Sequence, residues 1–291
     1  MKRILIFLFI IMALCGCSAE KPAQIAATTL PVYEFTARLT AGTGLSVTRL
    51  VTEEVSCLHD YSLNVKQAKA AEAADVIVIS GAGLEEFMED LLHGHKTVDA
   101  SSGLELLCPE DDHDHDHAHA HEGHHHEQDP HIWLSPNYAK GMVRNIAAGL
   151  TDTYPSHRET IAKNETDLLQ ELDTLEAYGK EALSALSCRE LITFHDGFSY
   201  FADAFGLTIL EAVEEESGSE ASAKELIHLI GEVEHHGLPA IFTEKSGSVS
   251  AASIIARETG CGSFALDMAM AGDSYFDAMY HNIHTIREAL Q

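Results

Sequence analysis

Three histidines and one aspartate lie at positions where a folded chain could bring them together around a metal ion. His59 follows a strand-like run that ends near Val51, and His195 and Asp267 each end an apolar run, while His131 comes just after a histidine-rich tract. Ligand sites of open α/β sheets form beyond the carboxyl ends of strands. Three neutral imidazoles and one carboxylate make a closed four-ligand set that suits Zn²⁺. Any one of these residues alone is more often an ordinary surface or core residue, so the prediction depends on the set.

The tract between Asp111 and Gln128 is a low-complexity segment in which histidine alternates with Asp, Ala, Glu and Gly. Its histidines are His113, His115, His117, His119, His121, His124, His125 and His126. The segment has almost no apolar surface to bury, so we expect a mobile loop. Such composition is typical of weak, exchangeable metal binding, and no single residue in it is given a specific role.

Net charge restricts the partners of the protein. The 291 residues include 18 Lys and Arg against 46 Asp and Glu, which gives a formal charge of −28. Nucleic acid and anionic lipid headgroups repel such a surface, so neither is expected as a direct partner. The charge favours cations, and the 19 histidines supply the commonest metal-binding side chain.

The N-terminus has the three-part layout of a secretory signal peptide. Met1-Lys2-Arg3 is basic, an apolar run covers Ile4 to Leu14, and Leu14-Cys15-Gly16-Cys17 resembles a bacterial lipoprotein box. We expect cleavage before Cys17 and lipid on its thiol, with an ordinary signal peptide cut nearby as the alternative. The protein is then exported and anchored to a bacterial membrane by its lipid, facing the periplasm or the cell exterior.

Export changes how the remaining cysteines are interpreted. An even number stays in the mature chain, in an oxidising compartment; they are Cys57, Cys108, Cys188 and Cys261. Four cysteines allow three pairings. We favour Cys57–Cys108 and Cys188–Cys261, one bridge in each half of the chain. A thiolate metal site is the rival, but the spacings contain no C-x2-C pattern.

Short apolar runs alternate with helical patterns along the mature chain, which predicts an α/β fold with mostly parallel sheets. The strand-like runs are 45–51, 75–80, 191–194, 207–210 and 240–243. Helix formers fill 156–186, and Ser156 with Glu159 forms a capping-box pattern. This helix would span about 45 Å. It would join an N-terminal lobe over 25–150, which includes the loop 111–128, to a C-terminal lobe over 189–291. A long surface helix within one domain is the alternative.

Several segments together resemble the zinc- and manganese-binding lipoproteins that serve ABC-type metal importers. They are Thr28–Tyr33, His59-Asp60-Tyr61, Asp129–Pro136, Phe194-His195-Asp196, Ile241–Glu244 and Glu258-Thr259-Gly260 before Leu266-Asp267. The resemblance covers nearly the whole mature chain, and an acidic histidine-rich loop is typical of the zinc members. It implies two α/β lobes joined by one long rigid helix, with the metal in the interlobe cleft. It also implies that His59, His131, His195 and Asp267 match the family's ligand positions.

The chain departs from the family pattern beside two of these ligands. Leu58 stands where the family usually has Pro before the first ligand, and Ser62-Leu63 replaces a Glu-Pro pair. Met268 replaces the Pro after the last ligand. Asp267 is therefore the least certain ligand, and Glu244 or a water molecule is the alternative.

The hypothesis from sequence is capture and release of a metal ion, not catalysis. The nitrogen-rich ligands favour Zn²⁺ as cargo, whereas the carboxylate leaves Mn²⁺ possible. A monomer that docks on the permease of an ABC importer is expected, with Asp60, Asp196 or Glu244 orienting the imidazoles. A secreted metal-dependent hydrolase is the alternative from another class, but the sequence has no H-E-x-x-H motif. An adhesin with the same fold is a third reading.

Overall fold

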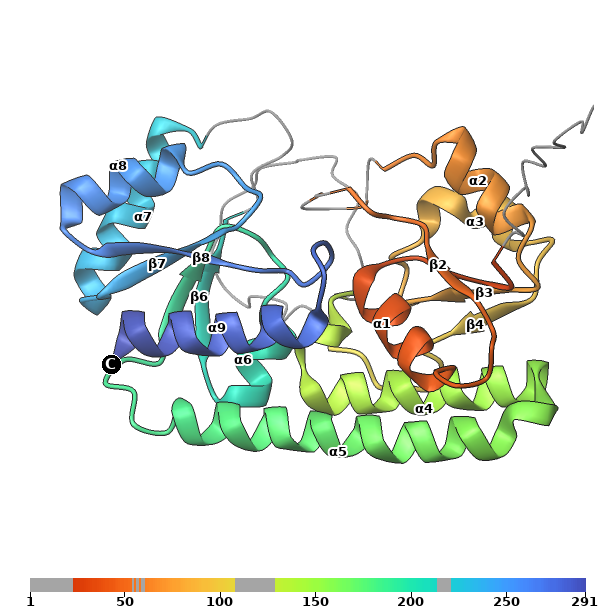
Figure 1. The fold of residues 1–291 in the computed structure, drawn as a ribbon. Coiled ribbons are helices and arrows are strands. Elements are labelled where there is room, and N and C mark those ends of the chain that lie inside the picture. The colour runs from red at the N-terminus through yellow and green to blue at the C-terminus, as the bar shows by residue number, and fades with distance from the viewer. Residues whose placement is uncertain (1–22, 54, 56–57, 59–60, 108–128, 214–220) are drawn as a thin grey trace, which may run out of the picture.

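The computed structural model describes residues 23–53, 55, 58, 61–107, 129–213 and 221–291. These residues form two α/β lobes that stand side by side above a long helix (Figure 1). The predicted signal peptide, its Cys17 and the histidine-rich tract lie outside the described residues. Within them, no helix combines the length and apolar character needed to cross a bilayer.

The N-terminal lobe is built on a four-stranded parallel sheet. In their order across the sheet the strands are β2 (Val47–Arg49), β1 (Ile25–Ala27), β3 (Val76–Ile79) and β4 (Thr97–Asp99). The lobe's helices are α1 (Leu30–Leu39), α2 (Val65–Glu72), η1 (Glu86–Met88), α3 (Glu89–Leu92), η2 (Ile132–Leu134) and α4 (Pro136–Thr153). The two central strands are buried along their whole length, as their unbroken apolar sequences require.

The C-terminal lobe repeats this arrangement. Its parallel strands, again in order across the sheet, are β6 (Thr208–Ala212), β5 (Glu190–Thr193), β7 (Ala240–Glu244) and β8 (Gly262–Leu266). Its helices are α6 (Ser199–Phe205), α7 (Ala223–His236), α8 (Ser250–Thr259) and α9 (Tyr275–Leu290). In each lobe the first strand lies between the second and the third, so the strand order reverses between β1 and β3 and between β5 and β7, while all strands stay parallel. Such switch points create crevices at the carboxyl ends of the strands.

The long helix α5 (Arg158–Ala182) is shorter at both ends than the predicted 156–186. The predicted capping box of Ser156 and Glu159 is wrong, because a 3-10 turn, η3 (Pro155–His157), comes first and His157 caps α5 without a side-chain bond. The helix packs against α1 and α4 along most of its length and against α6 and α9 near its C-terminal end, as Figure 1 shows. It therefore bridges both lobes and is not a surface helix of one domain.

One close approach shows how α5 meets the C-terminal lobe. A Cβ atom at Gly179 would lie 2.3 Å from a ring carbon of Phe205 on α6 and 3.0 Å from the Cδ1 atom of Ile283 on α9. A glycine is therefore needed there for the helices to pack this closely. On the other lobe, α5 is joined by ion pairs, Arg38 with Glu171 and Lys140 with Glu176.

The segment between β8 and α9 crosses from the C-terminal lobe to the N-terminal lobe, where Figure 1 shows it beside α1. Arg49 on β2 donates to the carbonyl of Gly272 at 2.8 Å. The indole N–H of Trp133 donates to the carbonyl of Met268 at 2.7 Å, and the hydroxyl of Tyr275 donates to the carbonyl of Trp133 at 2.8 Å. These three bonds, of which the two that involve Trp133 are buried, fix the chain that follows Asp267 against the other lobe.

The predicted Cys188–Cys261 disulfide is wrong, because both residues are free cysteines. Cys188 comes just before β5 and Cys261 just before β8, and β7 lies between those strands. Strands two positions apart in a sheet are roughly 9–10 Å apart, which exceeds the roughly 7 Å limit between the Cα atoms of a disulfide. The other predicted pair, Cys57 and Cys108, lies outside the described residues.

Candidate metal centre

His195 and Glu244 meet at the switch point of the C-terminal sheet. His195 comes two residues after β5, and Glu244 is the last residue of the neighbouring β7. The Nδ1 atom of His195 is 3.9 Å from the Oε2 atom of Glu244. Glu244 is 5% exposed, and burial raises its pKa to about 7, with the charge of Asp267 adding to the rise.

His131 reaches the same place from the other half of the chain. It directly precedes the 3-10 turn η2. The residue is 5% exposed, and its ring meets the ring of the fully buried Trp133 edge-on at a centroid distance of 5.3 Å. Trp133 therefore anchors the short helix that carries this imidazole.

The two imidazoles face each other through their Nε2 atoms, which are 3.4 Å apart. Zinc binds imidazole nitrogen at about 2.0–2.1 Å with tetrahedral angles, which places two such nitrogens about 3.4 Å apart. The observed spacing therefore fits two ligands of one tetrahedral zinc ion.

Each Nδ1 atom, on the far side of its ring, faces a carboxyl group, that of the partly buried Asp129 or that of the buried Glu244. The Oδ1 atom of Asp129 accepts from the Nδ1 and the backbone N–H of His131, at 2.8 and 2.9 Å. This bond leaves the Nε2 lone pair of His131 directed at His195. Glu244 lies behind His195, with its Oε2 atom 3.9 Å from Nδ1, which is beyond hydrogen-bond distance. A carboxylate that accepts from Nδ1, as Asp129 does, fixes the tautomer and raises the basicity of a metal-binding imidazole.

Asp129 is a functional candidate that the sequence reasoning missed. It lies two residues before His131, within the Asp-Pro-His segment, and that spacing was the available signal. Its second oxygen, Oδ2, is buried and has no hydrogen-bond partner among the described residues.

Gly197 allows the two rings to approach each other. A Cβ atom there would lie 2.7 Å from Cδ2 of His195, 3.0 Å from Nδ1 of His131 and 2.6 Å from Cε of Met268. Any other residue would push the imidazoles away from their present positions, so the glycine contributes directly to the 3.4 Å spacing.

Asp267 directly follows β8, as predicted, but its carboxylate is engaged locally. Oδ1 accepts from the backbone N–H of Ala269 at 2.8 Å, and Oδ2 lies 3.2 Å from the ammonium of Lys245. The described residues hold no cluster of three or more His, Cys, Asp or Glu side chains arranged for a metal. The structure thus joins His131 and His195 and leaves Asp267 apart.

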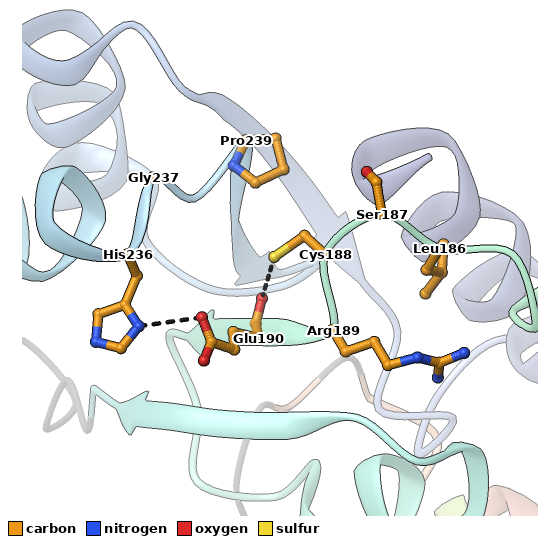
Figure 2. A pocket seen from close by; sticks show the side chains of 8 residues that line it. All are labelled: Leu186, Ser187, Cys188, Arg189, Glu190, His236, Gly237 and Pro239. Carbon is orange, nitrogen blue, oxygen red and sulfur yellow. Dashed lines mark hydrogen bonds and ion pairs between the residues drawn. The ribbon is translucent and has the colours of Figure 1, made fainter.

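The remaining predicted site residues are placed as follows. His59, Asp60 and the eight histidines of the tract lie outside the described residues. Asp196 is exposed on the turn after β5. A pocket lined by Cys188, Glu190 and His236, shown in Figure 2, lies at the opposite end of β5 from His195 and is separate from the imidazole pair.

Two α/β lobes whose imidazoles, one from each half of the chain, approach within 3.4 Å define a class of two-lobed metal-binding proteins. The chain belongs to the family described as ZnuA, zinc-uptake complex component A, periplasmic, whose profile matches residues 25–289. This match confirms the resemblance to the metal-binding proteins of ABC-type importers that the sequence motifs indicated.

Two relatives support this placement. The zinc-binding lipoprotein AdcA of Streptococcus pneumoniae R6 is 30% identical over 307 aligned positions, which cover 99% of this chain and 61% of AdcA. The chain thus spans about three fifths of the length of that relative. The high-affinity zinc uptake system protein ZnuA of Bacillus subtilis is 28% identical, with 97% of this chain and 94% of that protein covered.

A solved structure shows the same fold. The Zn(II)-bound ZnuA-like domain of Streptococcus pneumoniae AdcA superposes with a TM-score of 0.76 at 26% identity, covering 91% of this chain and 98% of that domain. The predicted two-lobed α/β architecture with a long helix is confirmed by this match and by the sheets described above.

Proposed function

We propose that this protein captures Zn²⁺ outside the cytoplasm and delivers it to an ABC-type importer. The observation that carries the proposal is the pair of Nε2 atoms of His131 and His195, 3.4 Å apart, with a carboxylate behind each ring. His59 would supply a third nitrogen, and Asp267 or a water molecule would complete the shell. Membership in a family of zinc-uptake components supports zinc as the cargo.

The placement of the carboxylates supports binding and not hydrolysis. A hydrolytic zinc needs a general base beside the metal-bound water. Asp129 and Glu244 face the Nδ1 atoms, on the far side of the rings from the metal position. They can orient the imidazoles but are not placed to take a proton from water on the metal.

Location and partner follow from the family and the N-terminus. The AdcA relative is named a lipoprotein, and the family description places its members in the periplasm. We propose lipid anchoring through Cys17 and docking on the membrane permease of an importer. Release then requires the permease to distort the ligand set, because a closed site of this kind dissociates slowly unless its geometry changes.

A chelator-competition titration with Zn²⁺ and Mn²⁺ tests the proposal. The mature protein lacking 111–128 is compared with its His131→Ala variant, and Trp133, the only tryptophan, reports binding by fluorescence. One tight zinc equivalent is expected, lost in His131→Ala and kept in His284→Ala, a matched change of an exposed histidine on α9. If no tight equivalent remains without the tract, the imidazole site is wrong and the protein is a surface metal buffer.

The histidine-rich tract is proposed to collect metal weakly and raise its local concentration. Deleting 111–128 should leave the equilibrium affinity of the tight site unchanged and slow zinc acquisition when the metal is scarce. Uptake by cells carrying either form, measured at limiting zinc, separates these effects. Loss of tight binding on deletion would refute this role.

A further inference from the structure

Lys245 is a charged residue beside the candidate ligand Asp267 that the proposed function has not used. It follows the last residue of β7, and its backbone N–H donates to the carbonyl of Leu266 at 2.8 Å. This bond places Lys245 next to the end of β8, where Asp267 begins the loop. Its ammonium is 3.2 Å from the Oδ2 atom of Asp267.

The backbone of Asp267 is held in place by the fully buried Asn282. The side chain of Asn282 accepts from the N–H of Asp267 and donates to its carbonyl, both at 2.7 Å. The Oδ1 atom is also engaged, by the backbone N–H of Ala269. Of the two carboxylate oxygens of Asp267, Oδ2 is therefore the one that can exchange its partner, and Lys245 is the partner it has in this structure.

Asp267 nevertheless lies next to the imidazole site. It directly follows Leu266, which pairs in the sheet with Glu244, the carboxyl behind His195. The side chain of Asp267 is 17% exposed, whereas that of Lys245 is 63% exposed, so the lysine can leave into solvent while the carboxylate stays.

We propose that Lys245 sets the metal affinity by competing with the divalent cation for Asp267. The inference rests on the proposed function and on Asp267 as a ligand. Before the metal can bind Oδ2, the lysine must release it, and the incoming cation also repels the ammonium. An ion pair with one exposed partner is weak, so the competition lowers the affinity by a factor of about three to five. Lower affinity in related sites mostly means faster dissociation, which suits a protein that gives up its cargo.

A double-mutant cycle on the full chain tests the competition. Zinc affinity is measured by chelator competition for wild type, Lys245→Met, Asp267→Asn and the double variant. Lys245→Met should tighten zinc binding about three- to fivefold, and in the Asp267→Asn background the same change should have no effect. The matched control Lys224→Met removes an equal charge from an exposed lysine at the start of α7 and should leave the affinity unchanged.

The outcomes separate this inference from the proposed function. Equal affinities of wild type and Lys245→Met would overturn the competition and leave zinc capture intact. Equal tightening with and without Asp267 would show a general charge effect and would also overturn it. A wild-type protein without any tight zinc site would overturn the proposed function and this inference together.

A second measurement follows the lysine itself. Zinc should release Lys245 from Asp267, so its rate of acylation, measured by mass spectrometry, should rise on zinc saturation, relative to that of Lys224. An unchanged rate in a zinc-loaded protein would contradict the exchange of partners.

Discussion

Replacing Asp129 by Asn tests whether the carboxylate behind His131 tunes the metal site. The change keeps the size of the side chain and an oxygen that accepts from the backbone N–H and the ring of His131, but it removes the charge. A hydrogen bond to a charged group contributes about 1.5–3 kcal/mol, against about 0.5–1.5 kcal/mol for a neutral one. The loss of about 1–1.5 kcal/mol corresponds to roughly tenfold weaker zinc binding.

The expected range is about 10- to 100-fold, because the neutral amide also makes the imidazole a weaker base toward the metal. Zinc affinity is measured by chelator competition with Trp133 fluorescence, since the Trp133 ring touches that of His131. The matched control is Asp152→Asn, which removes an equal charge from an exposed position near the end of α4. Equal affinities of Asp129→Asn and Asp152→Asn would refute the orienting role and the assignment of Nε2 as the ligand atom.

Three further changes have definite expected outcomes. Gly197→Ala should weaken zinc binding at least about tenfold with the fold retained, because its methyl group displaces both imidazoles. The control is Gly231→Ala, where a Cβ atom meets nothing within 4 Å. Equal zinc affinities of the two variants would contradict the steric argument. Burial raises the pKa of the Glu85 carboxyl from 4.5 to about 7. The protonated carboxyl therefore adds to the free energy of unfolding, in full below pH 4.5, and this contribution is lost as the pH rises through 7. Relative to Glu85→Gln, the metal-free wild type should lose about 3 kcal/mol of unfolding free energy across that range. Urea unfolding measures this, and an equal change of the two proteins' unfolding free energies with pH would disprove the prediction. Cys188 and Cys261 should both be alkylated in the unreduced protein, as mass spectrometry can show. A disulfide-linked peptide that contains both residues would contradict their assignment as free thiols.

The strands that could be predicted from sequence are those with a distinct apolar run. The runs at 75–80, 191–194 and 240–243 match β3, β5 and β7 to within one residue at each end, because these strands are largely buried and therefore mostly apolar. β1 and β4, three residues each, were missed because no longer alternating run surrounds them as the run 45–51 surrounds β2, and β8 was missed because its sequence GSFAL is only partly apolar. The long helix was found from its composition, but its first residue depended on Pro155 and the 3-10 turn, which a capping pattern does not reveal.

The sequence by itself determined the residue types of the site and the order of the elements, because both depend on local composition and on motifs. It identified His131 and His195 as partners, and the structure brings them together from separate halves of the chain. The sequence also indicated Glu244 as one of three candidates for orienting an imidazole, and the structure placed it behind His195. Only the tertiary structure showed Asp129 behind His131, Gly197 against both rings, and Lys245 on Asp267. It also separated Cys188 from Cys261 by placing β7 between β5 and β8. These contacts depend on strand order and on the crossing of the segment before α9, which are set by packing between residues far apart in the chain.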